Sequence, residues 1–274
     1  MDNLKTVSGY FHTDDTTAFF LADVLVAMVP MVFGAIWYFH LQAAVLLAAA
    51  TAACCLFDYL AGLLLRRQKR FDPSSLVTGL LYGLLLWPKV GAPTLLAGAF
   101  CATVLAKQAF GGFGKNPVNP ALVGFGVVLL LAGPAPQAQG LWLVSGNTRG
   151  LFMETSVFFV ALGAGYLLLR GLANFSFAIS FCLALFGLSQ LSGGLSLHIV
   201  PRVLLFSWFL ASDPVTTATT RLGNVLWGLL CALASSAFLA TGDLTGGMTI
   251  SFCVMSVFVF ALRRWDLPLA LRLS

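Results

Sequence analysis

Residues 19–65 read FFLADVLVAMVPMVFGAIWYFHLQAAVLLAAATAACCLFDYLAGLLL, and this stretch determines the class of fold. Asp23, His40 and Asp58 are its only acidic, basic or histidine side chains. An α-helix needs about 20 apolar residues to cross the hydrocarbon core of a bilayer. Residues 19–39 and 42–65 therefore predict two membrane-spanning helices in succession, and an integral membrane protein rather than a soluble domain.

The composition of the whole chain agrees with a bundle embedded in lipid. Of its 274 residues, 59% are hydrophobic and only 9% are charged, whereas soluble domains carry about 25% charged residues. The mean hydropathy is +0.93. The six cysteines lie in apolar runs without a CxxC pair, so we expect neither a disulfide framework nor a metal site. We also expect no nucleic-acid partner.

Together with further apolar runs, these two spans predict an all-α, polytopic protein of about ten transmembrane helices. Three runs of fourteen residues each, 75–88, 120–133 and 198–211, are bounded by Pro, Gly or Asp. Irregular backbone survives at membrane depth only where protein buries it or water reaches it, so short runs predict broken helices around an internal site. The other expected spans are 93–107, 155–172, 174–191, 223–240 and 247–263.

The distribution of basic residues predicts that both termini lie in the cytoplasm. Residues 1–18 do not resemble a cleaved secretory signal, so we expect the first span to be retained and the loop 134–154 to lie outside. Twelve basic residues then fall on the cytoplasmic side and three on the outer side. The cytoplasmic set is Lys5, Arg66, Arg67, Lys69, Arg70, Lys107, Lys115, Arg170, Arg221, Arg263, Arg264 and Arg272, and the outer set is Lys89, Arg149 and Arg202.

Two polar motifs open short spans. In FDPSSLVTGLL, residues 71–81, Asp72 and the following serines can cap a helix with Pro73 in its first turn. The alternative is a half-helix whose free N–H groups face a polar ligand. In KQAFGGFGKNPVNPA, residues 107–121, the glycines and the Asn-Pro steps at Asn116 and Asn119 exclude a regular helix. This second motif is either a cytosolic loop or a re-entrant element.

A third motif echoes the first. In SDPVTTATTRLG, residues 212–223, the Asp-Pro step begins at Asp213, which follows Asp72 by 141 residues. This echo suggests a duplication into halves of about 1–135 and 150–274, as in transport folds. An inverted repeat would place the two motifs on opposite sides, however, whereas the span count places both on the cytoplasmic side.

Asp58 and Glu154 are two acids that lie in or beside apolar spans. A carboxyl group in hydrocarbon usually faces the bundle interior, so Asp58 is a candidate ion or proton group. Glu154 opens the span at 155–172 and can act as a helix cap. Together with Asp72, Asn116, Asn119 and Asp213, Asp58 forms the candidate ion or ligand path.

The motifs DPSSLVTGLLYGLLLWP, KQAFGGFGKNPVNPALVG and SDPVTTATTRLG resemble RnfD, a component of the Rnf electron-transport complex, in order and spacing. That family includes the B component of the sodium-pumping NADH:quinone oxidoreductase, and the shorter chain favours the Rnf type. The resemblance covers about residues 17–264. It implies an electron-transfer subunit, not catalytic alone, of a bacterial or archaeal inner-membrane complex. That complex oxidises ferredoxin or NADH and moves Na⁺ or H⁺. The implied partners are flavin-bearing, iron–sulfur and membrane subunits.

The resemblance also implies FMN held by a phosphoester to a threonine hydroxyl, in the pattern Asp-x-x-Ser/Thr-Gly-Ala-Thr. The matching residues lie in the outer loop 134–154, with Thr148 as the acceptor. Ser145 and Gly146 would leave room for a flavin transferase, and Arg149 would pair with the phosphate. Asn147 and Trp142 depart from the pattern, where Ala and Asp are expected. A plain surface turn is the alternative, and a second, noncovalent flavin such as riboflavin is left open.

Two other functions compete with this one. A self-contained solute channel of urea-channel-like fold would also show many spans, broken segments and a duplication. A scaffold subunit that has lost its flavin would explain the imperfect threonine motif. An acceptor threonine in the outer loop, and dependence on partner subunits, would separate the electron carrier from both.

Overall fold

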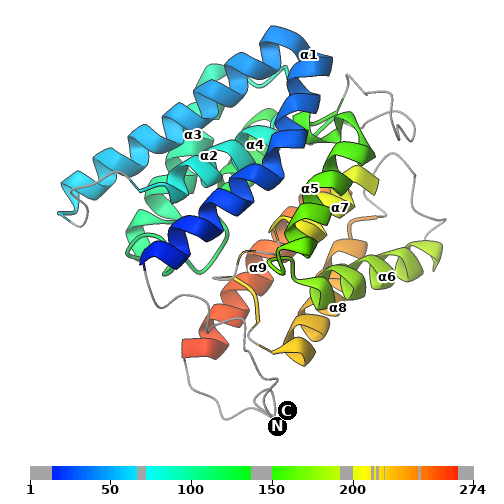
Figure 1. Cartoon of the computed structure of the whole chain (residues 1–274). Helices are drawn as coiled ribbons and strands as arrows, with labels where there is room; N and C mark the ends of the chain where they lie inside the picture. The colour runs from blue at the N-terminus through cyan, green and yellow to red at the C-terminus, as the bar shows by residue number, and fades with distance from the viewer. Residues whose placement is uncertain are drawn as a thin grey trace.

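The computed structural model describes residues 14–66, 72–136, 150–191, 200–210, 213, 216–218, 220–239 and 242–264. Within these ranges the regular secondary structure is helical, with short 3-10 and π turns and no strand. The helices pack side by side as a bundle (Figure 1). The expected all-α membrane fold is confirmed.

Helix α1, Asp14–Leu64, contains the first two expected spans. Its 51 residues are broken at His40, whose φ of 51° and ψ of −135° are not helical. The two ends of α1 lie on one side of the bundle and its kink on the opposite side (Figure 1). The predicted break between residues 39 and 42 is therefore confirmed.

A helix occupies each of the other expected runs, although many of these helices are short. Within the described ranges, three stretches are long and apolar enough by themselves to cross a membrane: Thr17–Leu64, Ala92–Phe110 and Leu244–Ala261. In chain order the remaining elements are α2 (Ser74–Leu84), α3 (Ala92–Phe100), the π turn Cys101–Leu105, the 3-10 turn Gln108–Phe110, α4 (Pro120–Ala132), the 3-10 turn Phe152–Thr155, α5 (Val157–Leu169), α6 (Phe175–Leu191), α7 (Val200–Trp208), α8 (Arg221–Ser236) and α9 (Leu244–Arg264).

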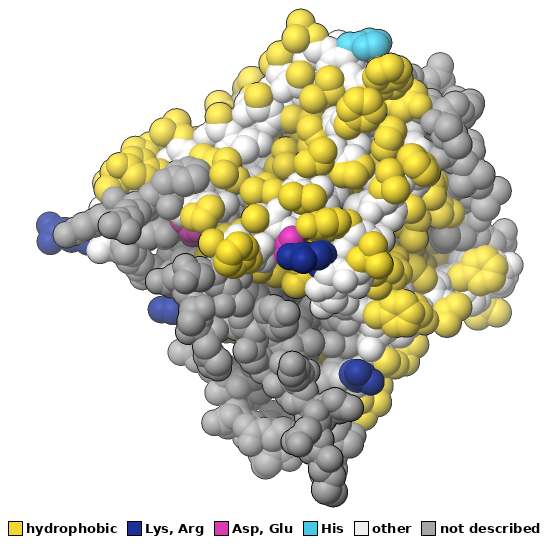
Figure 2. Space-filling model, viewed as in Figure 1, with side chains coloured by type: hydrophobic (Ala, Val, Ile, Leu, Met, Phe, Trp, Pro, Cys, Tyr) yellow, Lys and Arg dark blue, Asp and Glu magenta, His cyan; other side chains and the backbone are white. Residues whose placement is uncertain are grey.

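The outside of the bundle is apolar, as a surface in contact with lipid or with other membrane helices must be. Leu41 is 75% exposed and Leu130 is 86% exposed. Figure 2 shows hydrophobic side chains spread over most of the described surface on one face. Charged side chains on the described part of that face are few.

Helix α1 joins the two halves of the chain, because it packs against α2 and α3 on one side and against α5 on the other. Elsewhere α6 packs against α8, and α4 packs against both α3 and α9. Glycines allow the closest approaches. A Cβ atom placed on Gly98 of α3 would lie 2.2 Å from the Tyr82 hydroxyl and 2.9 Å from the carbonyl oxygen of Gly124 in α4.

Gly98→Ala should therefore lower the melting temperature of the purified protein. Overpacking of a fitted core costs about 1–3 kcal/mol, which outweighs the roughly 1 kcal/mol that alanine gains in helix propensity. Gly165→Ala in α5 is the matched control, because no described atom lies within 4 Å of its added Cβ. The packing assigned to α3 and α4 would be wrong if both variants melted at or above the wild-type temperature in a detergent thermal-shift assay.

Candidate functional site

A buried cation lies between two carboxylates at the centre of the candidate site. The Lys107 ammonium nitrogen is 3.1 Å from Oδ2 of Asp58 and 2.9 Å from Oδ2 of Asp72. Gln108 donates from Nε2 to the other Asp58 oxygen at 3.0 Å. Lys107 and Asp58 are each 1% exposed. An unpaired charge in an apolar bundle strongly destabilises the fold. The pairing of these groups therefore stabilises it.

Local backbone irregularity brings these side chains into contact. The helical hydrogen bonding of α3 widens into the π turn Cys101–Leu105 shortly before Lys107. Such π turns occur often at functional sites. Gly111 then ends the 3-10 turn Gln108–Phe110 with a φ of 117°, a value that favours glycine. The chain can thus leave the helix while Lys107 points back to α1.

Asp72 belongs to the same cluster and also caps α2. Its Oδ1 accepts a hydrogen bond from the Ser74 backbone N–H at 2.9 Å, as the first motif predicted. Burial alone would raise the pKa of Asp72. The Lys107 charge and the hydrogen bonds outweigh burial and hold that pKa below its usual value. One positive and two negative charges give the Lys107, Asp58 and Asp72 cluster a net formal charge of −1.

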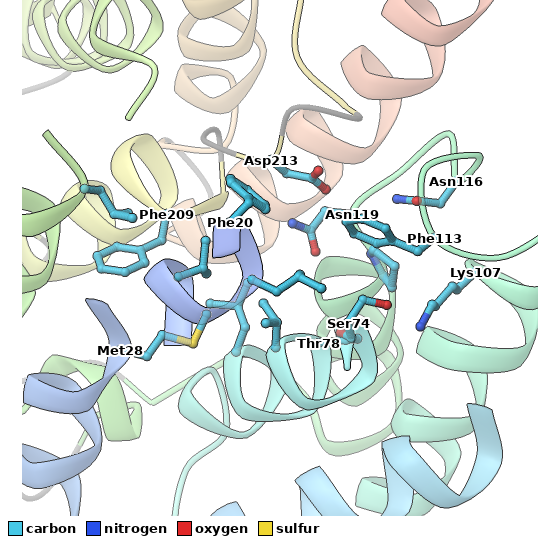
Figure 3. Close-up of a pocket in the computed structure, with 16 residues that line it drawn as sticks. Phe20, Met28, Ser74, Thr78, Lys107, Phe113, Asn116, Asn119, Phe209 and Asp213 are labelled. Carbon is cyan, nitrogen blue, oxygen red and sulfur yellow. The ribbon is translucent and has the colours of Figure 1, made fainter. Parts of the chain in front are cut away.

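A cavity of about 60 Å³ lies beside this cluster and gathers residues of all three motifs. In Figure 3, Ser74 and Thr78 approach it from α2 at the bottom of the view, Asn119 and Asp213 from above, and Lys107 lies to the right. A water molecule needs roughly 10–15 Å³ of such space, so the cavity has room for a few waters. Its remaining lining is mainly apolar and includes Phe20, Phe113 and Phe209.

The two asparagines of the second motif are buried at this cavity. Asn119 accepts from the Ala121 backbone N–H at 3.0 Å and thereby caps α4. Asn116 donates from Nδ2 to the Val118 carbonyl at 3.0 Å. Its carboxamide oxygen is buried and has no hydrogen-bond partner among the described residues. Such an oxygen can accept from water or bind a cation.

A second buried ion pair joins Arg202 of α7 to Glu154. Arg202 Nη2 donates to Glu154 Oε2 at 2.7 Å and to the Pro136 carbonyl at 3.0 Å. Its Nε also binds Glu154, and its Nη1 binds the Thr245 hydroxyl of α9. Glu154 accepts in addition from the Leu151 backbone N–H at 2.9 Å. Glu154 therefore does more than the simple helix cap that the sequence suggested.

The structure brings the separated candidates of the ion or ligand path to one place. Asn116, Asn119 and Asp213 line the cavity, and Asp58 and Asp72 hold the Lys107 that also lines it. The flavin candidates Ser145, Gly146, Thr148 and Arg149 lie outside the described residues.

Lys107 and Arg202 were not predicted as site residues from the sequence, because both were counted there as loop charges. A signal was available for Arg202, since it falls inside the expected span 198–211 and ionisable residues in spans are usually functional or paired.

The chain is similar to proteins named as the D subunit of an ion-translocating oxidoreductase complex. The model of the NQR2, RnfD, RnfE family matches residues 5–270. A protein of Cellvibrio japonicus, named as the D subunit of an ion-translocating oxidoreductase complex, is 36% identical over 56% of this chain and 44% of its own length. Its namesake in Mannheimia succiniciproducens is 32% identical over 50% of this chain and 38% of its own length. That of Yersinia enterocolitica is 24% identical over 95% of this chain and 96% of its own length. The matched part is thus less than half of two of these relatives.

Lys107→Met should destabilise the protein strongly, because it leaves the Asp58 carboxylate buried without its ammonium partner. Removal of one partner of a buried ion pair costs about 3–5 kcal/mol. Addition of both Asp58→Asn and Asp72→Asn should recover most of the loss, because Lys107 pairs with both carboxylates. Arg170→Met is the control, because the Arg170 side chain is 53% exposed and exposed pairs contribute about 0–1 kcal/mol. The folded fraction on heating measures the loss of stability in each variant. Equal losses of stability for Lys107→Met and Arg170→Met would contradict the burial of Lys107.

Proposed function

The chain belongs to the NQR2, RnfD, RnfE family, and from this premise we propose that it is the membrane electron-transfer subunit of an Rnf-type ion-translocating complex. The complex would move electrons from ferredoxin or NADH and couple that flow to Na⁺ or H⁺ transport. This chain would work with flavin-bearing, iron–sulfur and membrane subunits, and would not be catalytic alone.

The observation that carries the proposal is the convergence of the three motifs that the resemblance rests on. They begin at residues 72, 107 and 212, yet residues of all three line a single cavity beside a buried charge cluster. Convergence of distant polar motifs inside an apolar bundle is typical of a functional site in a membrane protein.

The charge cluster supports a role in ion coupling. Its two carboxylates share one ammonium, so the net negative charge favours a nearby cation. Asn116 and Asp213 line the neighbouring cavity. Oxygen ligands of the kind that these side chains carry suit a hard cation such as Na⁺.

The electron carrier in this proposal is FMN attached to Thr148. FMN can accept and donate one or two electrons, and the protein supplies attachment, orientation and electrostatics. Leu151, three residues after Thr148, is buried and its N–H binds Glu154. The chain after the acceptor is thus firmly anchored, which supports a cofactor carried at a defined place. A flavin transferase would attach the FMN.

A noncovalent riboflavin does not fit the described cavity as it stands. Pockets for ligands of drug size have volumes of about 300–1,000 Å³, whereas this cavity has about 60 Å³. Phe20, Phe113 and Phe209 would have to move aside to admit an isoalloxazine ring. A scaffold subunit without flavin remains the alternative that a flavin measurement must exclude.

The direct test is co-expression of the chain with a flavin transferase, followed by intact mass and in-gel flavin fluorescence. Wild type should carry one FMN that survives denaturation, and Thr148→Ala should carry none, because the acceptor hydroxyl is gone. Thr94→Ala, which changes a threonine of α3 outside the motif, should keep the adduct. A wild-type protein without adduct favours the scaffold, and an adduct that persists in Thr148→Ala places the attachment on another residue.

A further inference from the structure

Two buried oxygens at the cavity have no hydrogen-bond partner among the described residues. They are Ser74 Oγ and Asn116 Oδ1, and both residues line the cavity. Ser74 is 1% exposed and Asn116 is 2% exposed. In Figure 3, Ser74 lies on α2 and Asn116 on the loop before α4. A buried polar atom without a partner destabilises a fold, so two of them at one cavity indicate a ligand that they bind.

Local hydrogen bonds determine which atoms are left unused. Asn116 Nδ2 donates to the Val118 carbonyl at 3.0 Å, and this bond leaves the carboxamide oxygen as the unpaired end. The Ser74 backbone N–H binds Asp72 Oδ1, so the start of α2 does not use the Ser74 hydroxyl. The Thr78 hydroxyl donates its proton to the Ser74 carbonyl at 3.1 Å. Thr78 Oγ1 therefore keeps its lone pairs for a further partner at the same cavity.

The positive groups around the cavity are already neutralised. Lys107 Nζ lies between the carboxylates of Asp58 and Asp72. The N-termini of α2 and α4 would favour an anion, but each gives an N–H group to a capping side chain, Asp72 in α2 and Asn119 in α4. Asp213 adds a further carboxyl group to the lining. The unused atoms are therefore oxygens in a negatively charged setting, which favours a cation over an anion.

The two oxygens suit a metal cation better than a proton. Carboxamide and hydroxyl oxygens do not bind a proton near neutral pH, whereas hard cations take oxygen ligands of this kind. Residues 115–119, directly before α4, are not helical, and membrane transporters use such interrupted helices to hold Na⁺. The cavity of about 60 Å³ admits one ion with a few water molecules, each of which needs roughly 10–15 Å³.

We propose that Ser74 Oγ and Asn116 Oδ1 are ligands of a hard monovalent cation in this cavity, with water completing its ligand shell. Both ligands are neutral, so a monovalent ion is favoured over a divalent ion, which usually binds several carboxylates. The use of this cation in coupling rests on the proposed function above. Its binding rests only on the unpaired oxygens and the charge around them.

The test is isothermal titration of the purified full chain in detergent with NaCl, with choline chloride to keep the ionic strength constant. Wild type should bind one Na⁺. Ser74→Ala and Asn116→Leu should each bind it about tenfold more weakly, the factor expected for loss of one polar contact to a charged group. Ser74→Ala removes no hydrogen bond of the Ser74 hydroxyl from the described fold, so its melting temperature without Na⁺ should equal that of wild type.

Two control variants change similar residues away from the cavity. Ser75 follows Ser74 in α2 and is buried, but it does not line the cavity. Asn224 of α8 also carries a buried oxygen without a partner among the described residues, again outside the cavity lining. Ser75→Ala and Asn224→Leu should therefore bind Na⁺ as tightly as wild type when equal folded amounts are compared.

Folded wild type that binds no Na⁺ would overturn the site. Binding of wild-type strength in Ser74→Ala would overturn the assignment to these oxygens, as would equal weakening in the two controls. Na⁺ binding by a chain that carries no flavin would support the site and overturn only the proposed electron carrier. Flavin attachment without Na⁺ binding would have the opposite meaning.

Discussion

The pairing of Lys107 with Asp58 and Asp72 is the interaction on which the rest of the structure depends. In a bundle whose exterior is hydrocarbon-like, a charge left without its counterion costs about 3–5 kcal/mol, a large share of the roughly 5–15 kcal/mol of a domain's net stability. Lys107 Nζ lies 3.1 Å and 2.9 Å from its two carboxylates, and this requirement fixes three segments of the chain. The end of α1, the start of α2 and the end of the irregular α3 must meet at one point.

This requirement accounts for features that would otherwise look like defects. The π turn before Lys107, the 3-10 turn that follows it and the left-handed glycine at Gly111 each interrupt regular structure. Lys107 and Gln108, at the centre of these interruptions, are buried by protein, as polar groups at membrane depth must be. The same segments leave a small cavity, and the Asn116 oxygen beside it finds no partner among the described residues. Irregular backbone thus places polar groups inside an apolar bundle.

Local patterns in the sequence were sufficient to predict the elements but not their contacts. The apolar runs located the described helices, and the break in α1 at His40 follows from the excess length of one run. The Asn-Pro step correctly predicted the start of α4, because Asn119 caps that helix and Pro120 fits its first turn. The partners of Lys107 and Arg202 could not be read locally, because Asp58 and Glu154 are 49 and 48 residues away in the chain. The count of basic residues that predicted the orientation treats each one as a loop charge. It therefore did not single out Lys107 and Arg202 as buried.

We propose that the buried cluster of Lys107 and its carboxylates couples electron flow to ion movement. The most direct measurement is the number of ions taken up per electron by the intact complex in sealed vesicles, with the triple variant Lys107→Met, Asp58→Asn and Asp72→Asn, which neutralises the whole cluster, beside wild type. The account predicts that electron transfer continues in the variant while ion uptake per electron falls severalfold. An unchanged ratio of ions to electrons would contradict it and would leave the cluster with a structural role only.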